Sequence, residues 1–184
     1  MLELRPTELD GVIELYPKRI GDDRGFFSEV WNRARWQEAG LDLDFVQDNH
    51  SSSGNGVLRG LHYQLAPAAQ AKLVRVSRGA IFDVAVDIRR ASPSFGRWVG
   101  RTLSATGWNQ LLIPAGFAHG FLALEDGTEV QYKVDAPYSA AHDRALAADD
   151  PAIGIEWPLP PGDWVRSAKD QTAPALAQAD VFER

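Results

Sequence analysis

Hydrophobic and polar residues alternate over several short segments of the chain, and turn residues separate these segments. The alternation covers residues 72–77 and 80–88 around Arg78-Gly79, and residues 120–124 and 129–134 around Asp126-Gly127. A period of two is typical of β-strands, and a glycine between two such runs favours a tight reversal. We therefore predict a hairpin at each glycine. Further strands are expected at residues 11–15, 56–63, 97–103 and 110–113.

Helical patterns are sparse. Residues 32–39 are one candidate helix, because Asn32 can cap its first turn and Gly40 can end it. Residues 174–182 are a second candidate, and the prolines between residues 151 and 161 indicate an irregular stretch. Many short strands with few helices predict one all-β domain over residues 1–184, a sandwich or barrel whose mouth can hold a ligand.

The alternation also assigns side chains to the faces of two strands. The faces of strand 80–88 carry Phe82, Val84, Val86 and Ile88 on one side, and Ile81, Asp83, Ala85 and Asp87 on the other. In strand 129–134, Tyr132 shares a face with Val130 and Val134. A tyrosine hydroxyl on an apolar face needs a hydrogen-bond partner or a chemical purpose.

Composition narrows the function classes. The chain has 184 residues, of which 45% are hydrophobic, and a net charge of −6. This acidic balance argues against nucleic-acid binding, and the absence of cysteine excludes disulfides and cysteine-ligated zinc. No apolar run approaches the ~20 residues that span a bilayer, and the first residues lack a long apolar stretch. We expect a cytoplasmic protein that does not associate with membranes.

Two histidines lie in apolar, strand-like surroundings. Residues 114–119, which end in His119, resemble the second metal-binding box of the cupin superfamily. A metal-binding cupin also supplies a His-x-His pair and a glutamate as ligands. In this chain the second histidine of that pair is replaced, since His62 is followed two residues later by Gln64, and no glutamate occurs between residues 64 and 113. A metal site is therefore disfavoured, with Asp83 or Asp87 the remaining candidate ligands. Taken singly, each polar residue also has a purely structural explanation.

Several sequence blocks in order resemble the dTDP-4-dehydrorhamnose 3,5-epimerase family. These blocks are residues 23–29, 45–51, 56–64, 70–74, 83–89, 92–96, 113–121, 132–133, 149–151 and 167–170. The resemblance implies a cupin-like jelly-roll β-barrel with a few short helices, acting as a homodimer. It also implies an enzyme without cofactor or metal, which epimerises C3 and C5 of a dTDP-linked 4-keto-6-deoxyhexose on the way to dTDP-L-rhamnose.

The resemblance implies four catalytic residues. His62 would be the base that removes a proton beside the ketone, because the pKa of imidazole lies near ~6.5. Asp170 would orient the imidazole, with Asp83 as its rival for this role. Lys72 would stabilise the enolate oxygen, and Tyr132 would deliver a proton from the opposite face.

The remaining blocks imply substrate contacts. Arg24 and Arg59 suit a diphosphate, because guanidinium groups match its oxygens. The other expected contacts are Glu29, Gln47 and Asn49 for thymine and sugar, His119 and Lys169 for the substrate, and Tyr138 or Phe26 for stacking on the base. Asp143 stands where the family usually has glutamate, so its contact is expected to be shorter or lost.

Three alternatives stay open at this point. The chain could epimerise only C3 or only C5, as relatives in antibiotic-sugar pathways do. It could be a metal-dependent cupin enzyme. It could also bind the nucleotide sugar without catalysis.

Overall fold

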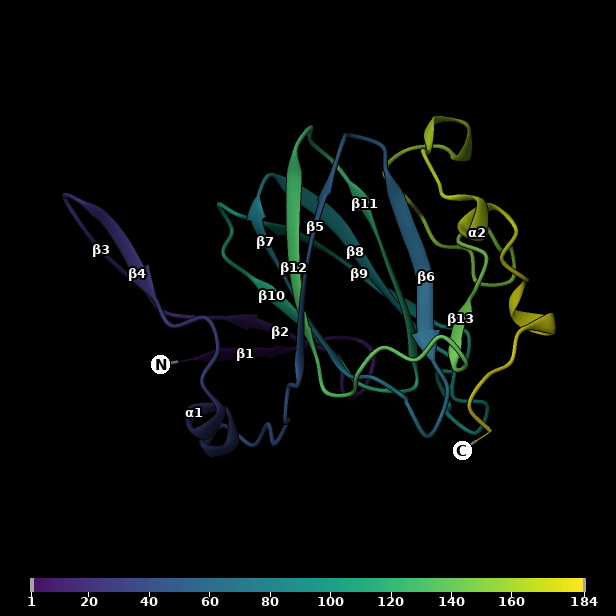
Figure 1. The fold of residues 1–184 in the computed structure, drawn as a ribbon, viewed down its shortest axis with the longest axis horizontal. Helices are drawn as coiled ribbons and strands as arrows, with labels where there is room; N and C mark the ends of the chain where they lie inside the picture. The colour runs from purple at the N-terminus through teal and green to yellow at the C-terminus, as the bar shows by residue number, and fades with distance from the viewer. Residues whose placement is uncertain (1, 184) are drawn as a thin grey trace.

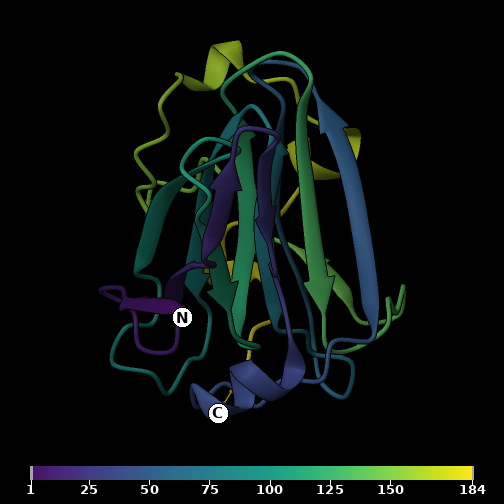
Figure 2. The same cartoon turned by 90° about the vertical axis from the view of Figure 1, so that its left-hand side faces the viewer.

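Two antiparallel sheets face each other in the computed structural model of the protein, which describes residues 2–183 (Figures 1 and 2). The first sheet has the order β1 (Glu3–Pro6), β2 (Ile13–Tyr16), β10 (Gln110–Ile113), β7 (Lys72–Arg78), β12 (Thr128–Val134) and β5 (Gln47–Ser53). The second has the order β13 (Asp143–Ala145), β6 (Leu58–Gln64), β11 (Phe117–Ala123), β8 (Ala80–Asp87) and β9 (Trp98–Ser104). The predicted all-β jelly-roll fold is confirmed.

Six elements lie outside these sheets, two of which are short 3₁₀ turns at Pro161–Asp163 and Leu176–Gln178. The other four are the strands β3 (Arg19–Asp22) and β4 (Gly25–Ser28), which form a hairpin, and the helices α1 (Arg33–Glu38) and α2 (Ala168–Gln171). The first predicted helix is confirmed as α1, since the Asn32 side chain accepts a hydrogen bond from the Arg35 amide. No helix among residues 2–183 is long and apolar enough to cross a membrane.

The two predicted hairpins are wrong, although their strands and turns are present. Strand β7 pairs with β10 and β12, whereas β8, the next strand along the chain, pairs with β9 and β11. In the same way β11 and β12 belong to different sheets. Each tight turn therefore crosses from one sheet to the other, because the apolar faces of consecutive strands pack against each other across the core.

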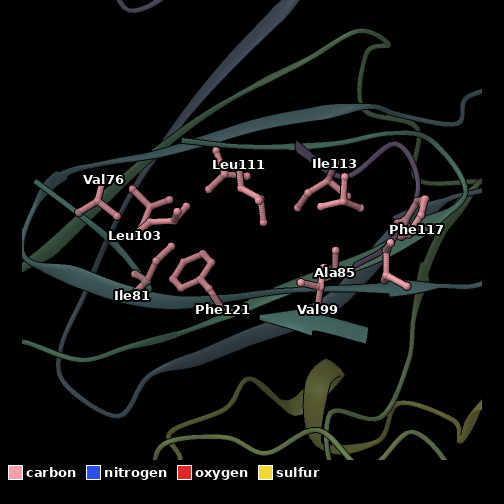
Figure 3. Close-up of a cluster of buried hydrophobic side chains, with 13 residues drawn as sticks. Val76, Ile81, Ala85, Val99, Leu103, Leu111, Ile113, Phe117 and Phe121 are labelled. Atoms are coloured by element: carbon pink, nitrogen blue, oxygen red, sulfur yellow. The ribbon is translucent and has the colours of Figure 1, made fainter. Parts of the chain in front are cut away.

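The core between the sheets is visible in Figure 3. It contains Val76 from β7, Leu111 and Ile113 from β10, and Ile81, Ala85 and Phe121 from the opposite sheet. Tyr132 packs against this cluster beside Val130, as the alternation predicts. Other inward positions on these strands are polar and buried, including Lys72, Asp83 and His119. The barrel interior thus continues from an apolar core into a polar pocket.

The outer face of the second sheet is covered by the C-terminal segment. Val84, Val86 and Ile88 form a second cluster with Leu176 and Phe182 on this face, which confirms the predicted split of the β8 side chains. The second predicted helix is wrong, because residues 174–182 contain only the 3₁₀ turn at Leu176–Gln178. Hydrogen bonds to the rest of the chain hold this segment extended, for example from the Phe182 amide to the Ile88 carbonyl at 3.1 Å.

The β3–β4 hairpin extends away from both sheets at the left of Figure 1. It was not predicted, and it carries large apolar side chains in the open: Ile20 is 58% exposed and Phe27 is 69% exposed. Strand β5 was also missed, because it reads Gln47-Asp48-Asn49-His50-Ser51-Ser52-Ser53 and contains no apolar residue. Its pairing with β12 alone makes it a strand.

Candidate active site

A pocket of about 360 Å³ opens between the two sheets. Its walls come from β5, β7 and β12 on one side, and from β6, β11 and α2 on the other. The lining residues are Gln47, Asn49, Ser51, Arg59, His62, Tyr63, Gln64, Gln70, Lys72, His119, Phe121, Tyr132, Tyr138, Asp143, Ser167, Lys169 and Asp170. Eleven of the thirteen predicted site residues are in this set.

His62 lies on β6 and is paired with Asp170. Its Nε2 atom is 2.5 Å from Oδ1 of Asp170, which is buried on the short helix α2. The Ser167 side chain caps that helix by accepting a hydrogen bond from the backbone amide of Asp170. Burial alone would raise the pKa of Asp170, but the hydrogen bond and attraction from His62, with further hydrogen bonds from Ser167 and the Gly60 backbone, together hold the pKa below its usual value. Asp170, and not Asp83, is therefore the partner of His62.

His119 and Asp83 form a second pair beside the first. Strands β11 and β6 place His119 directly opposite His62, and His119 Nε2 lies 2.7 Å from Asp83 Oδ1. Burial lowers the pKa of His119, although Asp83 raises it, so the ring is neutral at neutral pH. With its Nε2 proton donated to Asp83, the ring can accept a hydrogen bond at Nδ1.

The two histidines come close because the strands approach without side chains between them. A Cβ atom at Gly60 would lie 2.6 Å from the Gly120 Cα and 2.8 Å from the His119 carbonyl. Gly60 also has a backbone φ of +120°, a value that residues with a side chain rarely adopt. Glycine at both positions therefore lets β6 and β11 pack tightly beside the histidines.

Lys72 is buried between the sheets. Its Nζ atom donates to the His62 carbonyl at 3.1 Å, and so joins β7 of one sheet to β6 of the other. Burial lowers the pKa of Lys72 to about 8, against the opposing attraction of Asp83 and Asp143. The Oδ2 atom of Asp83 is buried without a hydrogen-bond partner among residues 2–183, and the attraction between this carboxylate and Lys72 is the largest influence that opposes the burial shift of the Lys72 pKa.

Tyr132 reaches the pocket from β12, in the opposite sheet to His62. Burial raises the pKa of Tyr132 above its usual 10, while Arg59 opposes the shift. The phenol therefore keeps its proton at neutral pH and can act as an acid. A proton acceptor and a proton donor thus line one pocket from two different sheets.

Two cations and an exposed aromatic ring lie at the mouth of the pocket. Arg59 donates from Nε to Ser53 Oγ at 3.0 Å and pairs with no carboxylate among residues 2–183. Lys169 Nζ lies 2.5 Å from Asp143 Oδ2, and the Tyr138 hydroxyl donates to the same carboxylate at 3.3 Å. Asp143, whose side chain is shorter than the usual glutamate of the family, is thus bonded by Lys169 and Tyr138 at the mouth of the pocket.

The first two predicted contacts on the chain, Arg24 and Glu29, do not line the pocket. Arg24 is on the protruding hairpin with an 89% exposed side chain, where it pairs with Asp22. Glu29 follows the hairpin and pairs with Arg35 at 3.0 Å. Within one chain the structure does not bring these two residues to the other eleven.

Sequence reasoning missed six lining residues: Ser51, Tyr63, Gln64, Gln70, Phe121 and Ser167. The sequence held one signal for Ser51. Every second residue of β5 points inward, and these inward residues are all polar: Gln47, Asn49, Ser51 and Ser53. Ser51 Oγ is buried without a hydrogen-bond partner among the described residues. Among residues 2–183, no three histidine, aspartate or glutamate side chains gather as metal ligands would.

Comparison with known proteins agrees with this geometry. Residues 6–178 match the sequence profile of the family described as dTDP-4-dehydrorhamnose 3,5-epimerase. The dTDP-4-dehydrorhamnose 3,5-epimerase of Salmonella typhimurium strain LT2 is 49% identical over 184 residues, which cover 100% of both chains.

Two solved structures are also similar. The dTDP-6-deoxy-D-glucose-3,5-epimerase of Legionella pneumophila, in complex with dTDP-4-keto-L-rhamnose, superposes with a TM-score of 0.95 at 41% identity, over 100% of this chain and 99% of that chain. A 3'-monoepimerase of Streptomyces bikiniensis, in complex with dTDP-quinovose, superposes with a TM-score of 0.86 at 34% identity, over 94% and 87% of the two chains.

The jelly-roll barrel and these similarities define an epimerase, an enzyme of the isomerase class. The chain belongs to the dTDP-4-dehydrorhamnose 3,5-epimerase family, as the sequence blocks indicated.

Proposed function

We propose that the pocket inverts C3 and C5 of a dTDP-linked 4-keto-6-deoxy-D-glucose by proton removal at one face and proton return at the other. The observation that carries this proposal is the position of His62 and Tyr132, which line one pocket from opposite sheets. Inversion needs two proton-transfer groups on different sides of one carbon, and this arrangement supplies them.

His62 is the base of this mechanism. Its Nε2–H is engaged by Asp170, so the lone pair of the neutral ring lies on Nδ1, and Nδ1 takes the proton from the sugar carbon. The imidazolium that forms is stabilised by the Asp170 carboxylate. Asp170 thus acts as a positioning residue and as the counter-charge of the base.

Proton removal beside the ketone moves charge onto the 4-keto oxygen. Lys72 is the buried cation of the pocket, and in this low-dielectric site it stabilises the enolate more than it stabilises the neutral ketone. Tyr132 then gives its phenolic proton to the carbon from the opposite face. Solvent resets both groups, by removing the proton from His62 and returning one to Tyr132.

The cations and polar side chains at the mouth bind the nucleotide. Arg59 and Lys169 attract the diphosphate, and the exposed ring of Tyr138 stacks on the thymine. Gln47 and Asn49 contact thymine and sugar from β5, while His119 accepts a hydrogen bond from a sugar hydroxyl. No step of this scheme requires a metal or cofactor. The expected cytoplasmic location and the single domain over residues 1–184 stay predictions.

The test of the function is proton NMR of dTDP-4-keto-6-deoxyglucose incubated with the enzyme in heavy water. We expect deuterium at both C3 and C5, together with the inverted product. Deuterium at C3 alone would assign the chain to the 3'-monoepimerases instead, and binding of the substrate without deuterium uptake would identify a catalytically silent binder.

A homodimer would explain the position of Arg24 and Glu29. The hairpin that carries Arg24 exposes Ile20, Phe26 and Phe27, and solvent-exposed apolar side chains on a protruding segment favour burial against a partner. We infer that a second copy of the chain covers this hairpin, and that the hairpin brings Arg24 and Glu29 over the partner's pocket. The diphosphate then meets guanidinium groups from both subunits.

Mixing two inactive variants tests the shared site. Arg24→Ala removes the guanidinium that is expected to contact the diphosphate, and His62→Ala removes the base. If each site combines both subunits, a mixed dimer has one site with both defects and one intact site. After subunit exchange of equal amounts, activity should recover to about a quarter of the wild-type value. No recovery, or a monomeric mass by light scattering, would contradict the shared site.

A further inference from the structure

The loop that presents Tyr138 is held in place without being packed into the core. It joins β12 to β13, and none of its residues 135–139 is buried. The Tyr138 side chain is 61% exposed at the pocket mouth, with only its hydroxyl bonded, to Asp143. Packing therefore contributes little to the position of this loop, and the hydrogen bonds of its backbone matter correspondingly more.

Those contacts come from three glutamine side chains on separate parts of the chain. Gln64 Nε2 donates to the Pro137 carbonyl at 3.2 Å, and Gln64 Oε1 accepts the Ser139 amide at 2.7 Å. Gln47 Oε1 accepts the Tyr138 amide at 3.0 Å, and Gln70 Nε2 donates to the Ala136 carbonyl at 2.7 Å. Each residue from 136 to 139 is thus bonded by a glutamine amide.

Gln64 is the central member of this set. It bonds the backbone on both sides of Tyr138, and its remaining donor bonds the Ala68 carbonyl at 2.7 Å. Its side chain is 3% exposed, so the three bonds form in a site that water scarcely reaches. It occupies the position where a metal-binding cupin has a histidine, and here all its polar atoms face the backbone.

We propose that Gln64 is a positioning residue for nucleotide binding, which together with Gln47 and Gln70 holds Tyr138 in its stacking position before the substrate arrives. The proposal rests on the stacking role of Tyr138 given above. A loop that these bonds hold in place before binding loses less conformational entropy when Tyr138 stacks on the thymine. Gln64 itself does not touch the reacting carbons, so its effect should fall on binding rather than on proton transfer.

Binding of dTDP, measured by titration calorimetry, tests this proposal. Gln64→Met keeps the length of the side chain and removes its hydrogen bonds, and we expect a dissociation constant for dTDP raised about tenfold. The KM of the sugar substrate should rise in parallel, while kcat changes much less. Protection of the Ser139 amide from hydrogen exchange should fall.

A double-mutant cycle separates positioning from general loss of structure. In a Tyr138→Ala background, Gln64→Met should leave the dissociation constant of dTDP unchanged, because the ring that it positions is absent. The matched control is Gln110→Met, which alters another buried glutamine bonded to a backbone carbonyl, that of Val30, outside the pocket. It should lower the melting temperature without weakening dTDP binding.

Three outcomes would overturn the proposal. Unchanged dTDP binding in Gln64→Met refutes the positioning role while the stacking role of Tyr138 stands. The positioning role is refuted in the same way if Gln64→Met weakens dTDP binding by the same factor in the Tyr138→Ala background as in the wild type. Unchanged binding in Tyr138→Ala refutes both roles. If Gln64→Met does not fold, Gln70→Met is measured in its place, and a smaller weakening that disappears in the Tyr138→Ala background is expected.

Discussion

The His62→Ala variant is expected to take up no deuterium at C3 or C5 of the substrate in heavy water, and its turnover should fall about 10³-fold. His62 is the proposed base for both carbons, and the other pocket histidine, His119, is engaged by Asp83 and has a lowered pKa. Removing His62 therefore leaves no equivalent proton acceptor, while the groups at the mouth of the pocket that bind dTDP are unchanged.

Loss of folding must be separated from loss of the base. His62→Ala leaves the buried Asp170 carboxylate without its partner, and an unpaired buried charge destabilises a fold. His62→Asn offers an amide donor to Asp170 but no base, so it should be equally inactive with a melting temperature closer to wild type. His50→Ala, on the outer face of β5, should keep full activity. Deuterium uptake in His62→Asn would contradict the assignment of the base.

The Tyr132→Phe variant is expected to exchange protons but to fail at inversion. His62 can still remove a proton, exchange it with solvent and return it to the same face, so deuterium should enter the starting sugar. Delivery from the opposite face needs the phenol, and formation of the inverted product should fall by about 10²–10³-fold. NMR of the same reaction reports both quantities, because starting material and product have separate signals.

The matched control for this variant is Tyr16→Phe. Tyr16 lies on β2 outside the pocket and bonds Glu14, so its replacement should leave both exchange and inversion unchanged. If Tyr132→Phe lowered exchange and inversion equally and mildly, the phenol would not be the acid of the second face. The division of roles between His62 and Tyr132 would then be wrong.

Much of the site could be predicted from the sequence, because most of its residues lie in the sequence blocks that resemble the family. Eleven predicted residues line one pocket, and alternation along β12 placed Tyr132 toward the interior. Other members were invisible to such patterns. Gln64 looked like a lost metal ligand, and only the path of the 135–139 loop reveals what its amide bonds. Strand β5 has no apolar residue, so hydrophobic periodicity could not detect it.

The pairing of His62 with Asp170 illustrates the limit of local patterns. The two residues are 108 positions apart, and Asp83 stayed a rival to the expected partner Asp170 until the chain path was known. Asp83 instead bonds His119, its neighbour across β8 and β11. Arg24 and Glu29 are a second case, because the hairpin removes them from the pocket of their own chain.

The amino-acid sequence by itself determined where most strands and turns lie, which side chains face inward, and which family the chain belongs to. Strands, turns and inward faces depend on neighbours within a few residues, since backbone alternation and turn preferences act locally, whereas the family is recognised from blocks along the whole chain. Only the tertiary structure decided that β7 and β8 lie in opposite sheets, that Asp170 pairs with His62, and that Gln64 bonds the backbone of the Tyr138 loop. Those arrangements arise from burying apolar faces against distant segments, and the energy of that burial depends on the path of the whole chain.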